Sequence, residues 1–328
     1  MPTVSVAELE SLCRAAFAAH GFDAEAADVC TREVVEAECR GRRSHGVAMV
    51  PRLLAAAKPD AGTPTRTLDS PTLAHIDGNG APGPLVSEIA MDLAIAKAEA
   101  GSGAAVGVRN DAVFLTAGYQ PRRAAERGLV ALVVGVAAPK LAPWGSAEAL
   151  IGTDPLGVAV PAEPEPLVLD MAIGALKPPD VRRAEQRGES LPDGVAIAAD
   201  GSPTTDPAAA LEGALLPFGG HRGSGLGIMI ELLAGALVGA HTGPLPGPAR
   251  GALFVALRPD SFGFGAEFAD AVREFAERVR DSPPRVGAER VLMPGDRAAA
   301  SARAARRDGL ELEESALEKL RTAGAGPA

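Results

Sequence analysis

Aromatic residues are scarce in this chain. Only 3% of its 328 residues are Phe, Tyr or Trp, although hydrophobic residues make up 47%. The chain therefore has ample material for a hydrophobic core, but that core must be built from Ala, Val, Leu and Gly rather than from large rings. Its length allows either one large α/β unit or two domains.

Cysteine is also rare. The three cysteines, Cys13, Cys30 and Cys39, all lie in the first forty residues. Their spacings match no metal motif, and an odd number of cysteines indicates reduced thiols in a cytoplasmic protein. We therefore expect no metal site.

Long apolar runs and basic stripes are absent as well. No apolar run reaches the ~20 residues that a membrane span needs, and the N-terminus lacks the charged and apolar regions of a signal peptide. The formal net charge is −10, with acids and arginines interleaved. These features exclude a membrane or nucleic-acid partner and predict a soluble, cytoplasmic protein.

The stretch with the fewest charges is Pro217–Ala240. It has five glycines among its first eleven residues, and from Leu226 onward its only ionisable residue is Glu231. Glycine lets a ligand approach the backbone, and the free N–H groups at a helix start, with Arg222 beside them, suit an anion. A core helix that follows a flexible loop would show the same pattern. We expect a helix over 223–240, buried nearly all round, at the centre of the fold.

The remaining pattern divides the chain into two parts. Residues 1–57 predict a helical cluster, with helices that start after Ser5 and after Asp23 and a third near His45. A linker follows over 58–71. Residues 72–321 predict an α/β domain. Its strands are expected at 73–77, 104–108, 130–136, 156–160, 167–169, 252–257 and near Val291, and its helices at 85–99, 117–127, 266–281, 298–306 and 313–321. The segment 172–210 is expected to be irregular and the tail 322–328 to be disordered. The glycines at 101–107 follow a helix and precede a strand, the reverse of a dinucleotide fingerprint.

Eight short motifs then occur in a fixed order. They are Ser44-His45-Gly46, DGNGAPG at 77–83, APWG at 142–145, IGTDPLGVAVP at 151–161, LDMA at 169–172, PTTDP at 203–207, the glycine loop at 219–227 and MPGD at 293–296. This series resembles the malate/L-lactate dehydrogenase family, which includes ureidoglycolate, sulfolactate and diketogulonate dehydrogenases and piperideine-carboxylate reductases. The resemblance runs from about Val6 to Leu320.

The resemblance implies a fold and a reaction. The expected fold is a non-Rossmann NAD(P)-binding α/β fold, in which a helical part packs on a mixed sheet, in a homodimer with its active site in an interdomain cleft. The implied reaction is hydride transfer between NAD or NADP and C2 of a small 2-oxo acid or cyclic imine. The sequence does not choose between the two cofactors.

The cofactor residues of the family are retained in part. The positions that match its cofactor contacts are Asp170, Met171 and Ala172, then Arg222 and Gly223 in place of Lys-Gly, and finally Pro294 and Gly295. Ser44 and His45 match the family's Ser-His pair. Arginine in place of lysine keeps a cation that can hold a phosphate.

The presumed catalytic side departs from the family. Its acid/base histidine is replaced by Val113, and its substrate-binding arginine falls at Met49, with Arg52 one turn later as a possible replacement. Further departures are Ala138 for Asp, Asp154 for Asn, Ile173-Gly174 for a Ser/Thr pair and Pro179-Asp180 for Gly-Lys. Because valine cannot carry a proton, reduction of a ketone should be impaired, whereas an iminium needs hydride alone.

Three functions remain open at this point. The first is an NAD(P)-dependent reductase with an altered substrate. The second is a non-redox enzyme for isomerisation, elimination or condensation, with His45, Ser44 and Lys140 as catalytic residues, and the third is a non-catalytic partner subunit. Lys140 would act only if its loop buries it and lowers its pKa. Tyr119 and His221 are lesser candidates for proton transfer.

Overall fold

A mixed seven-stranded sheet forms the centre of the chain. The computed structural model describes residues 2–56, 62–111, 114–244 and 250–326. The strands lie in the order β2 (Thr65–Asp69), β3 (Leu73–Asp77), β4 (Gly103–Arg109), β10 (Gly251–Leu257), β5 (Val130–Gly135), β6 (Leu156–Val160) and β7 (Leu167–Met171). Only β3 and β4 pair in parallel, and helix α4 (Gly83–Ala100) connects them. The predicted α/β fold class with a mixed sheet is therefore confirmed.

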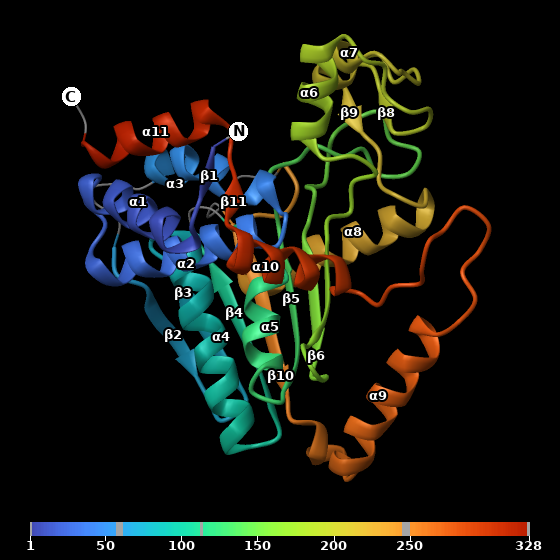
Figure 1. Ribbon diagram of the computed structural model, residues 1–328. Coiled ribbons are helices and arrows are strands. Elements are labelled where there is room, and N and C mark those ends of the chain that lie inside the picture. The colour runs from blue at the N-terminus through green and yellow to red at the C-terminus, as the bar shows by residue number, and fades with distance from the viewer. Residues whose placement is uncertain (1, 57–61, 112–113, 245–249, 327–328) are drawn as a thin grey trace.

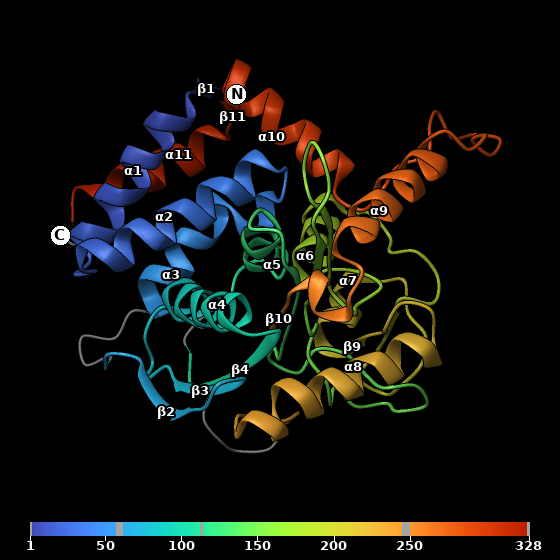
Figure 2. The same ribbon diagram turned by 90° about the horizontal axis from the view of Figure 1, so that it is seen from below.

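Helices cover both faces of this sheet (Figures 1 and 2). On one face lie α4 and α5 (Tyr119–Ala125), and on the other lies α8 (His221–Ala234). Alternate residues of β10 serve the two faces, because successive strand side chains point in opposite directions. Phe254 packs into the core under α4, whereas Leu253 packs with Ile230 and Ala234 of α8.

Helix α8 corrects one expectation. It lies on a face of the sheet rather than at its centre, and it is not buried all round. Ala234 is fully buried, but five apolar side chains on its other side and in the turn after it are 38% to 67% exposed: Ile228, Met229, Leu232, Leu233 and Leu237. A helix that is apolar on every side gives no signal of which side faces the core. The sequence pattern therefore could not distinguish a helix that is buried on all sides from one with an exposed apolar side.

The helical part is built from both ends of the chain (Figure 1). Ser5 and Asp23 cap α1 (Val6–Ala19) and α2 (Ala24–Cys39) as the sequence predicts. Strand β1 (Thr3–Val4) pairs with β11 (Leu310–Glu311), and α10 (Asp296–Asp308) and α11 (Glu314–Gly324) pack on the first helices. Their core joins Phe17 and Cys30 to Leu317 and Leu320.

Several local predictions are wrong or incomplete. The third helix begins as two short turns, η1 (Arg43–His45) and η2 (Val47–Met49), before α3 (Val50–Ala56). The linker contains β2, which has no alternating pattern because all five of its residues are exposed. The segment predicted to be irregular, 172–210, contains α6 (Pro178–Arg187), β8 (Ala196–Ile197) and the start of α7 (Pro207–Glu212). The later elements that have not yet been named are β9 (Ala214–Leu215), η3 (Ala236–Val238), η4 (Pro259–Phe262) and α9 (Gly265–Arg280).

The last part of the chain differs too. No strand forms near Val291 in the described residues, and α11 continues to Gly324, where the sequence predicts disorder. None of the helices in the described ranges is long and apolar enough to cross a membrane.

Candidate active site

The turn after α2 presents His45 toward the sheet. The buried carboxylate of Glu38 accepts a hydrogen bond of 2.9 Å from the Val47 amide, and this bond fixes the path of η1 and η2. Any side chain at Gly46 would collide with that carboxylate, so glycine is required there. Within the turn, the Ser44 hydroxyl and His45 Nδ1 are hydrogen-bonded at 3.0 Å.

Arg42 joins this turn to the edge strand β7. Its Nη2 donates to the Asp170 carbonyl oxygen at 2.9 Å, and its Nε lies 3.4 Å from the Asp170 carboxylate. Since Arg42 belongs to the helical part and Asp170 to the sheet, this ion pair joins the two parts. Both side chains are partly shielded from water, which strengthens the pair relative to one in open solvent.

Two adjoining cavities lie at this contact. The first is lined by His45 together with Asp170, Met171 and Ala172, and also by Lys177. The second shares Arg42, Thr116 and Asp170 with the first and reaches Gly295 and Tyr119. The structure therefore brings His45, the Asp170-Met171-Ala172 segment and Gly295 together from three distant segments of the chain.

The environment of His45 favours its neutral form. Burial lowers the pKa of its imidazole below the usual value, and the positive charges of Lys177, Arg42 and Arg52 lower it further, against the opposing effect of Asp170. A neutral imidazole can accept a proton at one ring nitrogen while the other donates a hydrogen bond.

Lys177 lines the first cavity, although no sequence pattern singled it out. It lies just before α6, three positions ahead of Asp180, where the family resemblance would place a lysine. A signal was available, because the chain has only five lysines and this one follows Asp170 by seven residues. Its displacement from the expected position concealed it.

Lys140 is not brought to these cavities. Its side chain is exposed, while its backbone carbonyl accepts from the Leu215 amide at 3.0 Å in the loop above the sheet. Its loop therefore does not bury it. His221 is also exposed, edge-on to Trp144 with ring centroids 6.1 Å apart. Val113 lies outside the described residues.

The other residues that differ from the family pattern lie in different environments. Met49 is half-buried and packs against the helical core, whereas Ala138 is exposed. Ile173 is fully buried under α8. Asp180 pairs with Arg183 on the surface of α6 at 3.4 Å.

The start of α8 fits a phosphate group. Gly219 and Gly220 both have φ of +61°, and no side chain caps the helix N-terminus. Arg222 stands exposed in its first turn, and Gly223 packs so closely on the Phe218 carbonyl that no side chain fits. An uncapped helix start beside a cation is favourable for an anion. Gly295 offers a second close approach, since its φ is +98° and a Cβ there would lie 3.0 Å from the Val168 amide.

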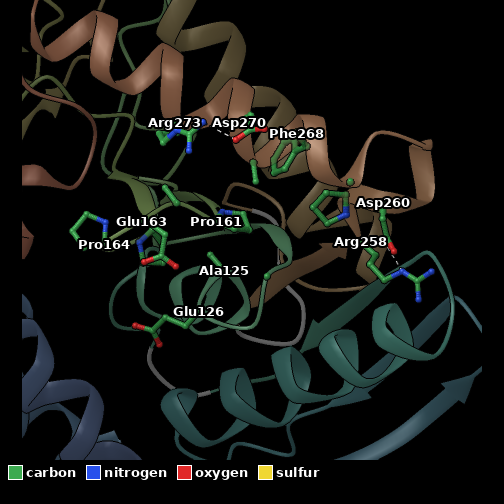
Figure 3. A pocket seen from close by; sticks show the side chains of 16 residues that line it. Ala125, Glu126, Pro161, Glu163, Pro164, Arg258, Asp260, Phe268, Asp270 and Arg273 are labelled. Atoms are coloured by element: carbon green, nitrogen blue, oxygen red, sulfur yellow. Dashed lines mark hydrogen bonds and ion pairs between the residues drawn. The ribbon is translucent and has the colours of Figure 1, made fainter.

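A wider pocket elsewhere contains none of these residues. It has a volume of about 780 Å³ and lies between α9 and the turn that joins β6 to β7. Figure 3 shows prolines on its floor and two charged pairs on its wall, Arg273 with Asp270 and Arg258 with Asp260, each at 2.7 Å. These four charges are satisfied by one another, and the pocket contains none of the residues that the family resemblance assigns to the cofactor or to catalysis. No group of His, Cys, Asp and Glu in the described ranges could hold a metal ion.

Comparison with known proteins gives a consistent result. The sequence pattern of the malate/L-lactate dehydrogenase family matches residues 4–321. A Δ1-pyrroline-2-carboxylate/Δ1-piperideine-2-carboxylate reductase from Pseudomonas putida is 36% identical, over 97% of this chain and 96% of its own. An L-sulfolactate dehydrogenase from Methanothermobacter thermautotrophicus is 34% identical, over 90% and 89%.

Solved structures agree with this result. The sulfolactate dehydrogenase of Methanocaldococcus jannaschii superposes with a TM-score of 0.90 at 30% identity, over 99% of this chain and 98% of that one. Members of the family are NAD(P)-dependent dehydrogenases, and one relative, from Chromohalobacter salexigens, is described as an NADP(+) enzyme. By sequence pattern, by identity over nearly its whole length and by fold, this chain belongs to the malate/L-lactate dehydrogenase family.

Proposed function

We propose that this chain is an NAD(P)-dependent reductase of a small cyclic imine or 2-oxo acid, with the imine as the better substrate. The observation that supports this proposal is the pair of cavities in which His45 meets the Asp170-Met171-Ala172 segment and Gly295. A cleft between two parts of a chain, with convergent polar groups and a shifted histidine pKa, is typical of an active site.

The cofactor would lie along the edge strand β7. In this proposal Asp170, Met171 and Ala172 line its path, Pro294 and Gly295 approach it with their backbone, and Arg222 and Gly223 hold a phosphate at the start of α8. The nicotinamide ring supplies the hydride. The fit rests on the uncapped helix N-terminus, the exposed Arg222 and the left-handed Gly295.

Proton supply favours an imine over a ketone. A ketone oxygen must gain a proton during reduction, and a well-placed acid accelerates that step by roughly 10² to 10⁴. Val113 replaces the family's acid, and the environment of His45 favours its neutral form. An iminium is already protonated and needs no such acid. In this proposal Ser44 orients His45 through the hydrogen bond of 3.0 Å, and His45 orients the substrate's nitrogen or oxygen.

Titration with NADH and NADPH tests the proposal. The single tryptophan, Trp144, packs beside Gly220 at the start of α8, so its emission should report binding there. The Arg222→Ala variant should weaken binding by roughly tenfold, as expected for loss of a charge-assisted hydrogen bond. Arg285→Ala, at an exposed position without an assigned role, is the matched control. If the wild type binds neither nucleotide at millimolar concentration, the proposal fails.

We also propose that the protein is a cytoplasmic homodimer. The outer side of α8 and its following turn expose five large apolar side chains, among them Met229 and Leu237. Contiguous exposed apolar residues of this kind are typical of an interface. The double change Met229→Glu with Leu237→Glu should halve the mass measured by light scattering. A dimer that persists in this variant would place the interface elsewhere.

A further inference from the structure

The site cavity contains one cation that the protein itself does not neutralise. Arg42 is engaged by Asp170, through both its carbonyl and its carboxylate. His45 is bonded to Ser44. The ammonium group of Lys177, which lines the same cavity, makes no hydrogen bond or ion pair with any residue in the described ranges.

Among the substrates of the proposed reaction, the 2-oxo acids and the cyclic imino acids carry a carboxylate beside the reacting carbon. A partly buried carboxylate needs a cation or several hydrogen bonds, because leaving it unpaired away from water is costly. The family resemblance assigns this cation to a position that is Met49 here, and the Gly-Lys of the family is Pro179-Asp180. The side chains of Met49, Pro179 and Asp180 carry no positive charge and cannot pair with a carboxylate.

We infer that Lys177 is the cation that binds the substrate carboxylate in this protein. This inference rests on the proposed function, and it assigns to that site a residue at a position where the family resemblance expects none. A lysine three residues before the usual one reaches the cavity because α6 starts at Pro178.

The backbone holds Lys177 in a defined place. Its φ of −92° and ψ of 140° are extended, as expected for a residue that precedes proline. Its carbonyl oxygen accepts from the amides of Asp180 at 2.9 Å and Val181 at 3.3 Å. The fully buried Val181 anchors α6 in the core below. The backbone therefore fixes the position from which the Lys177 side chain lines the cavity.

Arg52 is the competing candidate. It lies near enough to His45 to affect the pKa of that imidazole, as do Arg42, Lys177 and Asp170. Its side chain is exposed, and it does not line the cavity. A solvated arginine binds a carboxylate only weakly, since water and salt screen the attraction. Lys177 is therefore the better placed of the two.

Ligand binding tests the inference directly. The probes are pyrrole-2-carboxylate, a planar analogue of a cyclic imino acid, and the uncharged pyrrole-2-carboxamide, measured by calorimetry with NADPH present. The variants are Lys177→Met, Lys177→Arg and Lys140→Met. Lys177→Met should weaken the carboxylate by roughly tenfold or more and leave the carboxamide unchanged. Lys177→Arg should retain most of the affinity, and Lys140→Met, the same change at an exposed lysine, all of it.

Other outcomes overturn the inference. Unchanged carboxylate affinity in Lys177→Met, or an equal loss for carboxylate and carboxamide, would show that Lys177 does not bind the anion. A lower kcat with unchanged analogue affinity would make it a proton donor instead. Absence of NADPH binding by the wild type would overturn the proposed function, and that result is distinct from either of these.

A second measurement needs neither cofactor nor substrate. In a proton NMR titration of the histidines, with His45 assigned from the His45→Asn variant, Lys177→Met should raise the His45 pKa by roughly half a unit or more, because a nearby positive charge is removed. Lys140→Met should not move it. A His45 pKa that stays constant in folded Lys177→Met protein would place the ammonium away from this cavity and overturn the inference. Equal melting temperatures for the variants establish that the comparison is between folded proteins.

Discussion

The buried residue Asp154 allows a test of how one raised pKa affects the pH dependence of stability. It is fully buried, and its Oδ1 accepts from the Ala137 amide at 3.2 Å. The neighbouring Glu231 is also buried and accepts from the amides of Gly152 at 3.0 Å and Gly243 at 2.7 Å. Burial raises the pKa of Asp154 well above its ordinary value of 3.8, and the Glu231 charge raises it further. Asp154 therefore keeps its proton in the folded protein, where it resembles the asparagine that the family has at this position.

The Asp154→Asn variant should remove a pH dependence of stability. In the wild type, the folded state holds this proton at pH values where the unfolded aspartate has lost it. Stability then falls as the pH rises from about 4 toward the raised pKa, by up to about 1.4 kcal/mol for each pH unit. The asparagine side chain has no such proton. Between pH 5 and pH 7 the decline in unfolding free energy should be smaller in the variant by up to about 2.7 kcal/mol.

Urea unfolding followed by far-UV circular dichroism, at one protein concentration, measures this difference. The buried acids Glu33 and Asp111 have pKa values raised to about 7 and about 6, but the wild type and the variant both contain them, so their contributions cancel. The amide introduced by Asp154→Asn can also keep the bond from the Ala137 amide and donate to Glu231. Equal pH slopes in the two proteins would show that Asp154 does not keep its proton in the folded protein.

Three further predictions concern packing, thiols and chemistry. Ala234→Glu should lower the free energy of unfolding by several kcal/mol, because it places an unpaired charge at a fully buried position of α8. A melting temperature within a degree or two of the wild type, or of the exposed Ala208→Glu control, would contradict this prediction. The three cysteines are buried with pKa values raised by burial, so a disulfide reagent should label none in the native protein and all in denaturant. Cyclic imino acids should be reduced faster than the matching 2-oxo acids, and Val113→His combined with Met49→Arg and Ala138→Asp should narrow that gap; a wild type that prefers the oxo acid would end the proton-supply account.

Local signals in the sequence predicted the elements that those signals control. The capping residues Ser5 and Asp23 fixed the starts of α1 and α2, and the β-branched residues of 130–136 marked β5. The motif series singled out His45 and the segment from Asp170, and both line one cavity of the structure. These successes rest on patterns of a few adjacent residues, where sequence and local conformation are tightly linked.

Features that depend on tertiary contact were beyond such patterns. Strand β2 is fully exposed, and its side chains carry no alternation. The exposure of Lys140 and the burial of Asp154 follow from how their loop packs against β9 and α8, which a single sequence does not encode at short range. Lys177 lies three residues before the position that the family pattern assigns to a lysine, and only the folded chain brings it beside His45.

The pairing of β1 with β11 has a consequence for synthesis on the ribosome. Phe17 and Cys30 share their core with Leu317 and Leu320. The helices that are synthesised first therefore cannot bury their apolar sides until the last helices of the chain have been synthesised. Contacts so distant in sequence form slowly and leave hydrophobic surface open to chaperones and to aggregation in the meantime. Because Arg42 and His45 extend from that late-closing part, a nascent chain cut short before α10 would carry the whole sheet and still lack the cleft that α10 and α11 hold in place.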